Sequence, residues 1–120
     1  MSALQIEQLS IQTTRATDKV RLDWRGTGRL QDAHGQLSPF LDQASADAAA
    51  AGVSIEMHIE EMAFLNSETM GAVIRFIKVS LDRRVGVEFV FDSGQSWQRL
   101  FSEGLRGFER RSGLFTLRPA

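Results

Sequence analysis

The sequence predicts an α/β fold in which a mixed β-sheet of about five strands carries its helices mainly on one face. Segments 20–25, 53–59 and 85–91 alternate between apolar and polar residues, which is typical of strands with one buried side. Segments 37–51 and 70–81 repeat apolar residues at i, i+3, i+4 and i+7, which indicates helices with one buried face. Because the strands are apolar on one side only, we expect no helices on the other face of the sheet.

The first strand is the least regular. Leu4 and Ile6 alternate, but the phase slips before Leu9 and Ile11, which indicates a bulge or an edge strand. The polar segment 13–18 then predicts a hairpin turn.

The last third of the chain predicts a helix over about 95–108 and a short final strand over 114–118. Gly104 weakens the helix in its middle. The expected order is therefore β-β-α-β-α-β-α-β. The later strand–helix–strand units require parallel pairing, and the first hairpin requires antiparallel pairing.

The polar sides of the strands should together form the open face of the sheet. They carry both signs of charge, so we expect charge pairs between neighbouring strands. The residues assigned to this face are Arg21, Asp23, Arg25, Ser54, Glu56, His58 and Glu88.

Length and composition predict one cytoplasmic domain over residues 1–120. The formal net charge of −1 gives no electrostatic reason to expect nucleic acid or an anionic membrane as a partner. The chain has no cysteine, which excludes disulfides and thiol catalysis. It shows no secretory signal and no apolar run of the roughly 20 residues that span a membrane.

The segment "FLNSETMG", residues 64–71, lies where a strand gives way to a helix. Asn66 is suited to cap the helix, and Glu68 is favoured by the positive end of the helix dipole. Thr69 supports the cap, and Gly71 allows a neighbouring group to approach closely. A well-capped helix start explains all of these residues.

The same residues also fit a functional hypothesis. Free N–H groups at a helix N-terminus attract anions. A phosphoryl group on Ser67 or Thr69 would add about two negative charges there and would repel a partner that docks on this corner.

Apolar residues surround this segment. Met57, Met62 and Met70 are of a type that more often fills gaps in a core. Met62 and Phe64 precede the helix in a predicted connection, where exposed apolar groups often bind partners. Both interpretations remain open for Met62.

Catalytic and metal sites are weakly indicated. Glu56, His58 and Glu60 point the same way along one strand, but a polar strand face explains them without a metal. Neither His34 nor His58 is close to Ser67 in the sequence, and the common hydrolase, metalloprotease and phosphate-loop motifs are absent. We therefore expect no enzyme activity, no cofactor and no bound metal.

Two segments resemble the STAS domain, the fold of bacterial anti-sigma-factor antagonists. They are "GRLQDAHGQL", which begins at Gly28, and "VSIEMHIEEMAFLNSETMGAVIRF", which begins at Val53. The tail, "WQRLFSEGLRGFERRSGLFTLRP", is similar to the end of that family, so the resemblance covers roughly residues 4–118. It implies a mixed sheet with helices on one face and a switch at the start of the second helix.

This chain departs from the family at that switch. Asn66 replaces the usual Asp, Ser67 is kept, Glu68 replaces the phosphorylated residue, and Thr69 replaces a glycine. Three hypotheses follow: the acceptor has moved to Ser67 or Thr69, the switch has been lost, or Glu68 acts as a fixed substitute for phosphate.

The resemblance implies a non-enzymatic signalling module that binds a switch kinase, an anti-sigma factor or a phosphatase; self-association into a homodimer is compatible with it. The expected partner-binding residues are Asn66, Ser67, Glu68, Thr69, Met70, Gly71, Met62, Phe64 and Gly28. Two alternatives are a small-ligand or lipid-binding module and a constitutive subunit of a larger assembly.

Overall fold

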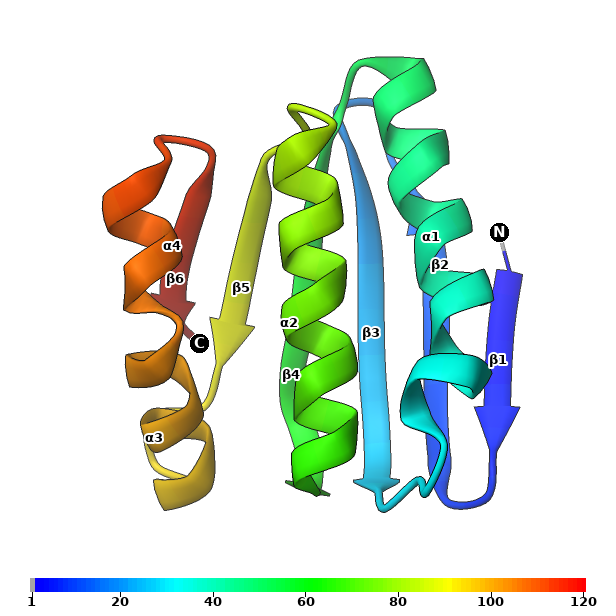
Figure 1. Cartoon of the computed structure of the whole chain (residues 1–120), viewed down its shortest axis with the longest axis vertical. Coiled ribbons are helices and arrows are strands. Elements are labelled where there is room, and N and C mark those ends of the chain that lie inside the picture. The colour runs from blue at the N-terminus through cyan, green and yellow to red at the C-terminus, as the bar shows by residue number, and fades with distance from the viewer. Residues whose placement is uncertain (1) are drawn as a thin grey trace.

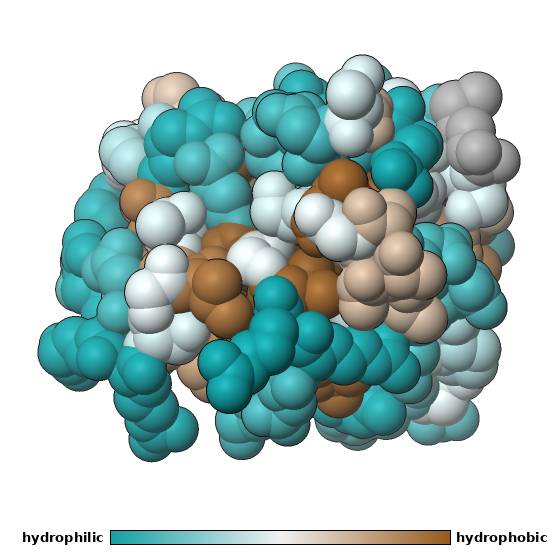
Figure 2. Space-filling model, turned by 90° about the horizontal axis from the view of Figure 1, so that it is seen from above, coloured by the Kyte–Doolittle hydropathy of each residue, from teal (hydrophilic) through white to brown (hydrophobic). Residues whose placement is uncertain are grey.

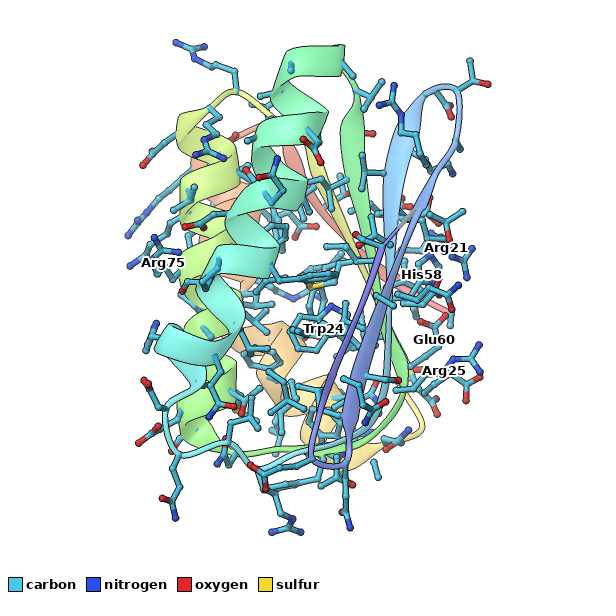
Figure 3. All side chains as sticks on the ribbon, turned by 90° about the vertical axis from the view of Figure 1, so that its right-hand side faces the viewer. Arg21, Trp24, Arg25, His58, Glu60 and Arg75 are labelled. Carbon is cyan, nitrogen blue, oxygen red and sulfur yellow. The ribbon has the colours of Figure 1, made fainter. Side chains whose placement is uncertain are left out.

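The computed structural model describes residues 2–120 and contains one six-stranded mixed sheet with four helices. All helices lie on one side of the sheet (Figures 1 and 3). In chain order the elements are β1 (Ser2–Ile6), β2 (Leu9–Arg15), β3 (Lys19–Gly28), α1 (Ala33–Ala51), β4 (Ser54–Leu65), α2 (Ser67–Asp82), β5 (Val87–Phe91), α3 (Ser96–Gly104), α4 (Arg106–Arg111) and β6 (Phe115–Pro119).

The strands lie in the sheet in the same order as in the chain, β1-β2-β3-β4-β5-β6. β2 runs antiparallel to both of its neighbours, β1 and β3, and β3 to β6 run parallel. The predicted mixed sheet and one-sided helical layer are confirmed.

The sixth strand comes from the irregular first segment. Residues 7 and 8 form a tight turn, with Glu7 at φ 52°, and Ile6 pairs with Leu9 across it. The phase slip therefore marks a chain reversal rather than a bulge. Cross-strand partners share one face of a sheet, so Ile6 and Leu9 both turn toward the helices although they are three residues apart. The strand before the turn, β1, is an edge strand, which was the second of the two predictions.

The predicted hairpin turn over 13–18 is shorter than expected, because residues 13–15 belong to β2 and only residues 16–18 connect it to β3. Two further elements also differ from the predicted bounds. The segment after residue 59, expected to be a connection, continues as β4 to Leu65, and its pairing with β3 shifts register twice. The expected helix over 95–108 is divided into α3 and α4 at Leu105.

The core lies between the sheet and the helices. Trp24 of β3 and Phe76 of α2 are among its largest fully buried side chains, and Trp24 lies between the two layers in Figure 3. Seen from above, hydrophobic residues show at the centre of one end of the molecule and hydrophilic residues surround them (Figure 2). The core thus approaches the surface at that end. None of the helices within residues 2–120 combines the length and the hydropathy that a membrane-spanning helix needs.

The other face of the sheet carries the predicted charge pairs. Lys19 of β3 donates to Glu56 of β4 at 2.7 Å, and Arg118 of β6 lies 3.2 Å from Glu88 of β5. Arg21, Arg25, His58 and Glu60 point away from the helices in Figure 3. Charged side chains therefore cover the face that has no helices.

Candidate functional site

Asn66 is the capping residue of α2, as predicted. Its side-chain oxygen accepts hydrogen bonds from the Thr69 backbone N–H at 2.9 Å and from the Thr69 hydroxyl at 2.6 Å. Its side-chain NH₂ donates to the Leu30 carbonyl at 3.1 Å, and its backbone N–H donates to the Gly28 carbonyl at 2.8 Å. Asn66 thus joins the start of α2 to the segment that follows β3.

The bond to Leu30 gives a physical reason for Asn at position 66. A carboxylate only accepts hydrogen bonds, whereas an amide both accepts and donates. An Asp here would keep the bonds from Thr69 but would place a negative oxygen against the Leu30 carbonyl. The geometry of this helix start therefore favours the amide.

Gly28 and Thr69 form the buried base of the site. A Cβ on Gly28 would lie 2.7 Å from Leu65 Cδ2 and 3.0 Å from Thr69 Cγ2, so a side chain at Gly28 would force its neighbours to move. Thr69 is fully buried and its hydroxyl is already bonded to Asn66. A kinase would reach the Thr69 hydroxyl only after the start of α2 had opened.

Ser67 and Glu68 form the exposed part of the same helix turn. Of the two predicted phosphate acceptors, Ser67 is the one that the folded chain presents to solvent. Glu68 lies in the first turn of α2, where the partial positive charge of the helix end stabilises a carboxylate. The site thus has a charged surface above a fixed base.

An aromatic cluster borders the site, and the sequence analysis did not predict it. The rings of Phe64 and Trp97 lie 6.3 Å apart, and the Arg29 guanidinium lies 4.7 Å above the Phe64 ring. Phe64 and Trp97 are half-buried and Arg29 is exposed. We call Arg29, Phe64 and Trp97 the aromatic rim. The sequence offered two signals for this cluster, Arg29 next to Gly28 and Trp97 within "SGQSWQ". No local pattern places these residues together.

The remaining predicted residues divide between surface and interior. Met70 and Gly71 are half-buried, and His34 of α1 lies against Gly71, where a Cβ would be 3.4 Å from its ring nitrogen Nε2. This is the close approach that the glycine predicted. Met62 is buried, with 1% of its surface exposed, so it supports the site from below and is not accessible to a partner.

Glu56, His58 and Glu60 lie on the opposite face of the sheet, and His58 is hydrogen-bonded to both carboxylates. His58 Nε2 lies 2.5 Å from Glu56, and His58 Nδ1 lies 3.0 Å from Glu60. Burial would raise the pKa of Glu56, but hydrogen bonds from Lys19 and His58 outweigh it and lower that pKa from 4.5 to about 2. In the part of the chain that is described, no group of three such residues is arranged to hold a metal.

Comparison of the sequence with models of protein families and with curated proteins finds no match.

Proposed function

We propose that this chain is a STAS-like regulatory module that works by binding another protein at the start of α2. One observation carries the proposal: the exposed residues Ser67 and Glu68 stand on a buried, hydrogen-bonded base, beside the half-exposed aromatic rim. Charge, apolar area and rigidity are combined within one corner of the molecule. Rigid presentation of such a surface lowers the entropy lost on binding.

The mechanism would be control of association by charge. A phosphoryl group on Ser67 would lie at the positive end of α2, which stabilises it within this chain. The same charge would have to be desolvated or paired when a partner covers the corner, and a partner with acidic groups there would be repelled. The STAS resemblance supports this proposal through the motif at residues 64–71 and through the one-sided helical layer that it implies.

The proposal is tested by mapping phosphosites and capturing partners from the source organism. We expect phosphate on Ser67 and no phosphate on the buried Thr69. We also expect a partner that binds the native chain and is lost with Ser67→Asp and with Trp97→Ala. Ser67→Asp adds a charge that suits a helix N-terminus, so loss of stability would not explain the lost binding.

Gln43→Lys is the matched control because Gln43 is an exposed residue of α1. It should leave the capture unchanged. Retention of the same partners by Ser67→Asp, Glu68→Lys and Trp97→Ala would contradict a docking site at this corner.

A further inference from the structure

The two edges of the sheet are protected to different degrees. At the β6 edge, the Leu117 N–H donates to the Glu109 carboxylate of α4 at 3.4 Å. The next two residues are Arg118, which is charged, and Pro119, which has no N–H. Charges, prolines and side-chain covers are the means by which proteins prevent another strand from pairing with an edge. The β6 edge therefore has three of them.

The β1 edge has none of these protections. β1 is the five-residue strand "SALQI", which contains no charge and no proline. It pairs with β2 on its inner side, and no strand of the described chain lies beyond it. In an antiparallel strand the N–H and C=O groups of alternate residues point outward, so those of β1 are available to a further strand.

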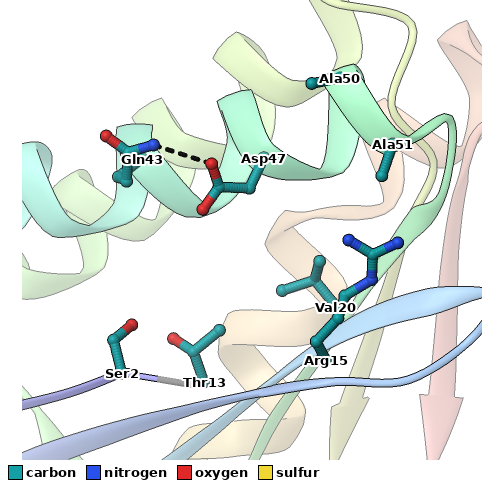
Figure 4. A pocket seen from close by; sticks show the side chains of 8 residues that line it. All are labelled: Ser2, Thr13, Arg15, Val20, Gln43, Asp47, Ala50 and Ala51. Atoms are coloured by element: carbon teal, nitrogen blue, oxygen red, sulfur yellow. Dashed lines mark hydrogen bonds between the residues drawn. The ribbon is translucent and has the colours of Figure 1, made fainter.

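The helical layer also leaves space beside β1. A groove of about 690 Å³ opens between α1 and the strands at this edge (Figure 4). Ser2, Thr13, Arg15 and Val20 line it from the sheet, and Gln43, Asp47, Ala50 and Ala51 line it from α1. Leu4 and Ile6, on the helix side of β1, remain only half-buried. An added strand at this edge therefore finds apolar surface to cover.

We propose that the β1 edge binds the β1 edge of a second copy of this chain, antiparallel and about a two-fold axis at Leu4. All five residues of β1 are then paired. Leu4 lies opposite Leu4 of the second copy, and Ala3 lies opposite its Gln5. Ile6 lies opposite Ser2 of the second copy, at the mouth of the groove that Ser2 lines.

The sequence of β1 favours a second copy as the occupant. Because the strand is uncharged, two-fold pairing brings no like charges together, whereas like charges directly opposite would destabilise it. The helix-side residues Ser2, Leu4 and Ile6 meet the same three residues, so apolar area is covered symmetrically. One short strand pair buries less area than the roughly 1,000 Å² of a stable interface, so the dimer should be weak and concentration-dependent. This inference does not rest on the proposed function.

Charge placement at Ala3 and Gln5 tests the register. Both side chains are exposed, so substitution there should leave the fold intact. In the proposed register, Ala3→Lys with Gln5→Lys sets two pairs of like charges opposite each other, and Ala3→Glu with Gln5→Lys sets two pairs of opposite charges. By sedimentation equilibrium of the full chain, the first variant should dimerise about tenfold more weakly than the native chain. The second should dimerise at least as well as the native chain. Thr116→Lys, on the exposed side of β6, should have no effect.

A cysteine cross-link provides an independent test because the chain contains no cysteine. Under mild oxidation, Leu4→Cys should give a disulfide-linked dimer, since directly opposed Cα atoms lie about 4.5–5.5 Å apart. Thr116→Cys should not. A native chain that stays monomeric at about 1 mM would overturn the proposal. So would a dimer that ignores the lysine pair, or a β1 edge occupied by a strand of another protein while the purified chain stays monomeric.

Discussion

At the scale of single residues, the most constrained charge is the Glu56 carboxylate. It is 9% exposed, and it accepts a hydrogen bond from Lys19 at 2.7 Å while lying 2.5 Å from His58. Burial raises its pKa, but hydrogen bonds from Lys19 and His58 outweigh burial and lower that pKa to about 2 in the folded chain. A carboxylate held in this way links folding stability to pH.

We predict that Glu56→Gln lowers the free energy of unfolding at pH 7 by about 1–3 kcal/mol, because the bonds to Lys19 and His58 lose their charged acceptor. The folded pKa of Glu56 lies below its ordinary value of 4.5. Its stabilising effect is therefore complete above about pH 4.5 and is lost as the pH falls toward about 2.

Urea unfolding of the native and Glu56→Gln proteins between pH 7 and pH 3 should show their free energies of unfolding converging as the pH falls. Glu61→Gln, an exposed neighbour on β4, should change stability by less than about 0.5 kcal/mol. A Glu56 effect that does not vary with pH would contradict the argument.

At the scale of elements, one glutamine fixes α3 to the sheet. Gln98 is fully buried, and its side-chain NH₂ donates to the carbonyls of Ile59 and Met62, at 3.0 and 3.1 Å. Its side-chain oxygen accepts from the Asp92 N–H at 2.7 Å. The bonded carbonyls lie where β4 departs from regular pairing. Gln98 thus satisfies backbone groups that the sheet leaves free.

We predict that Gln98→Leu destabilises the protein by about 2–4 kcal/mol, because it keeps the side-chain volume but leaves buried backbone groups unpaired. Chemical denaturation measures this loss. Hydrogen exchange should show faster opening of α3 and of residues 59–62. The matched control is Gln43→Leu, which removes one surface bond to Asp47 and should cost about 0.5 kcal/mol or less. Equal stability of native and Gln98→Leu proteins would show that the three bonds contribute nothing net.

The elements also show what local pattern predicts and what it cannot. Periodicity placed α1, α2, β3 and β5 within a few residues of their bounds, because each buries one regular face. The pattern fails in the last third of β4: the buried residues Ile59 and Met62 are three apart, and the register against β3 shifts. The cap at Asn66 was predicted because its bonds to Thr69 are local. The aromatic rim and Gln98 were not, because they depend on contacts between residues some 35 positions apart, and a buried glutamine has no sequence signal.

At the scale of the whole molecule, the sheet is covered by two different kinds of layer. Helices bury one face, and charged side chains bury part of the other, where His58 is 7% exposed. Breaking one partner of a buried charge pair is costly, whereas replacing the pair with apolar residues is often neutral or stabilising. The charged layer is therefore better explained by solubility than by stability. An apolar surface on this face of the sheet would bind the apolar surfaces of other molecules, and the charged side chains prevent this.

We predict that Glu56→Leu combined with His58→Val keeps a thermal midpoint close to that of the native chain but makes the protein self-associate through the open face. Lys19 and Arg21 are exposed enough to be solvated once Glu56 is removed, and the Glu60 side chain, which loses His58, is 25% exposed. The double variant therefore leaves no fully buried charge unpaired. Glu56→Leu alone should be less stable than the double variant, because His58 then loses one of its two partners.

Both variants are best made in the Ala3→Lys, Gln5→Lys background, so that pairing at the β1 edge does not contribute to the sedimentation profile. A double variant that remains monomeric would show that the charges do not serve to keep this face apart from other molecules. One that loses as much stability as the two single variants together would show instead that the charged layer holds the fold.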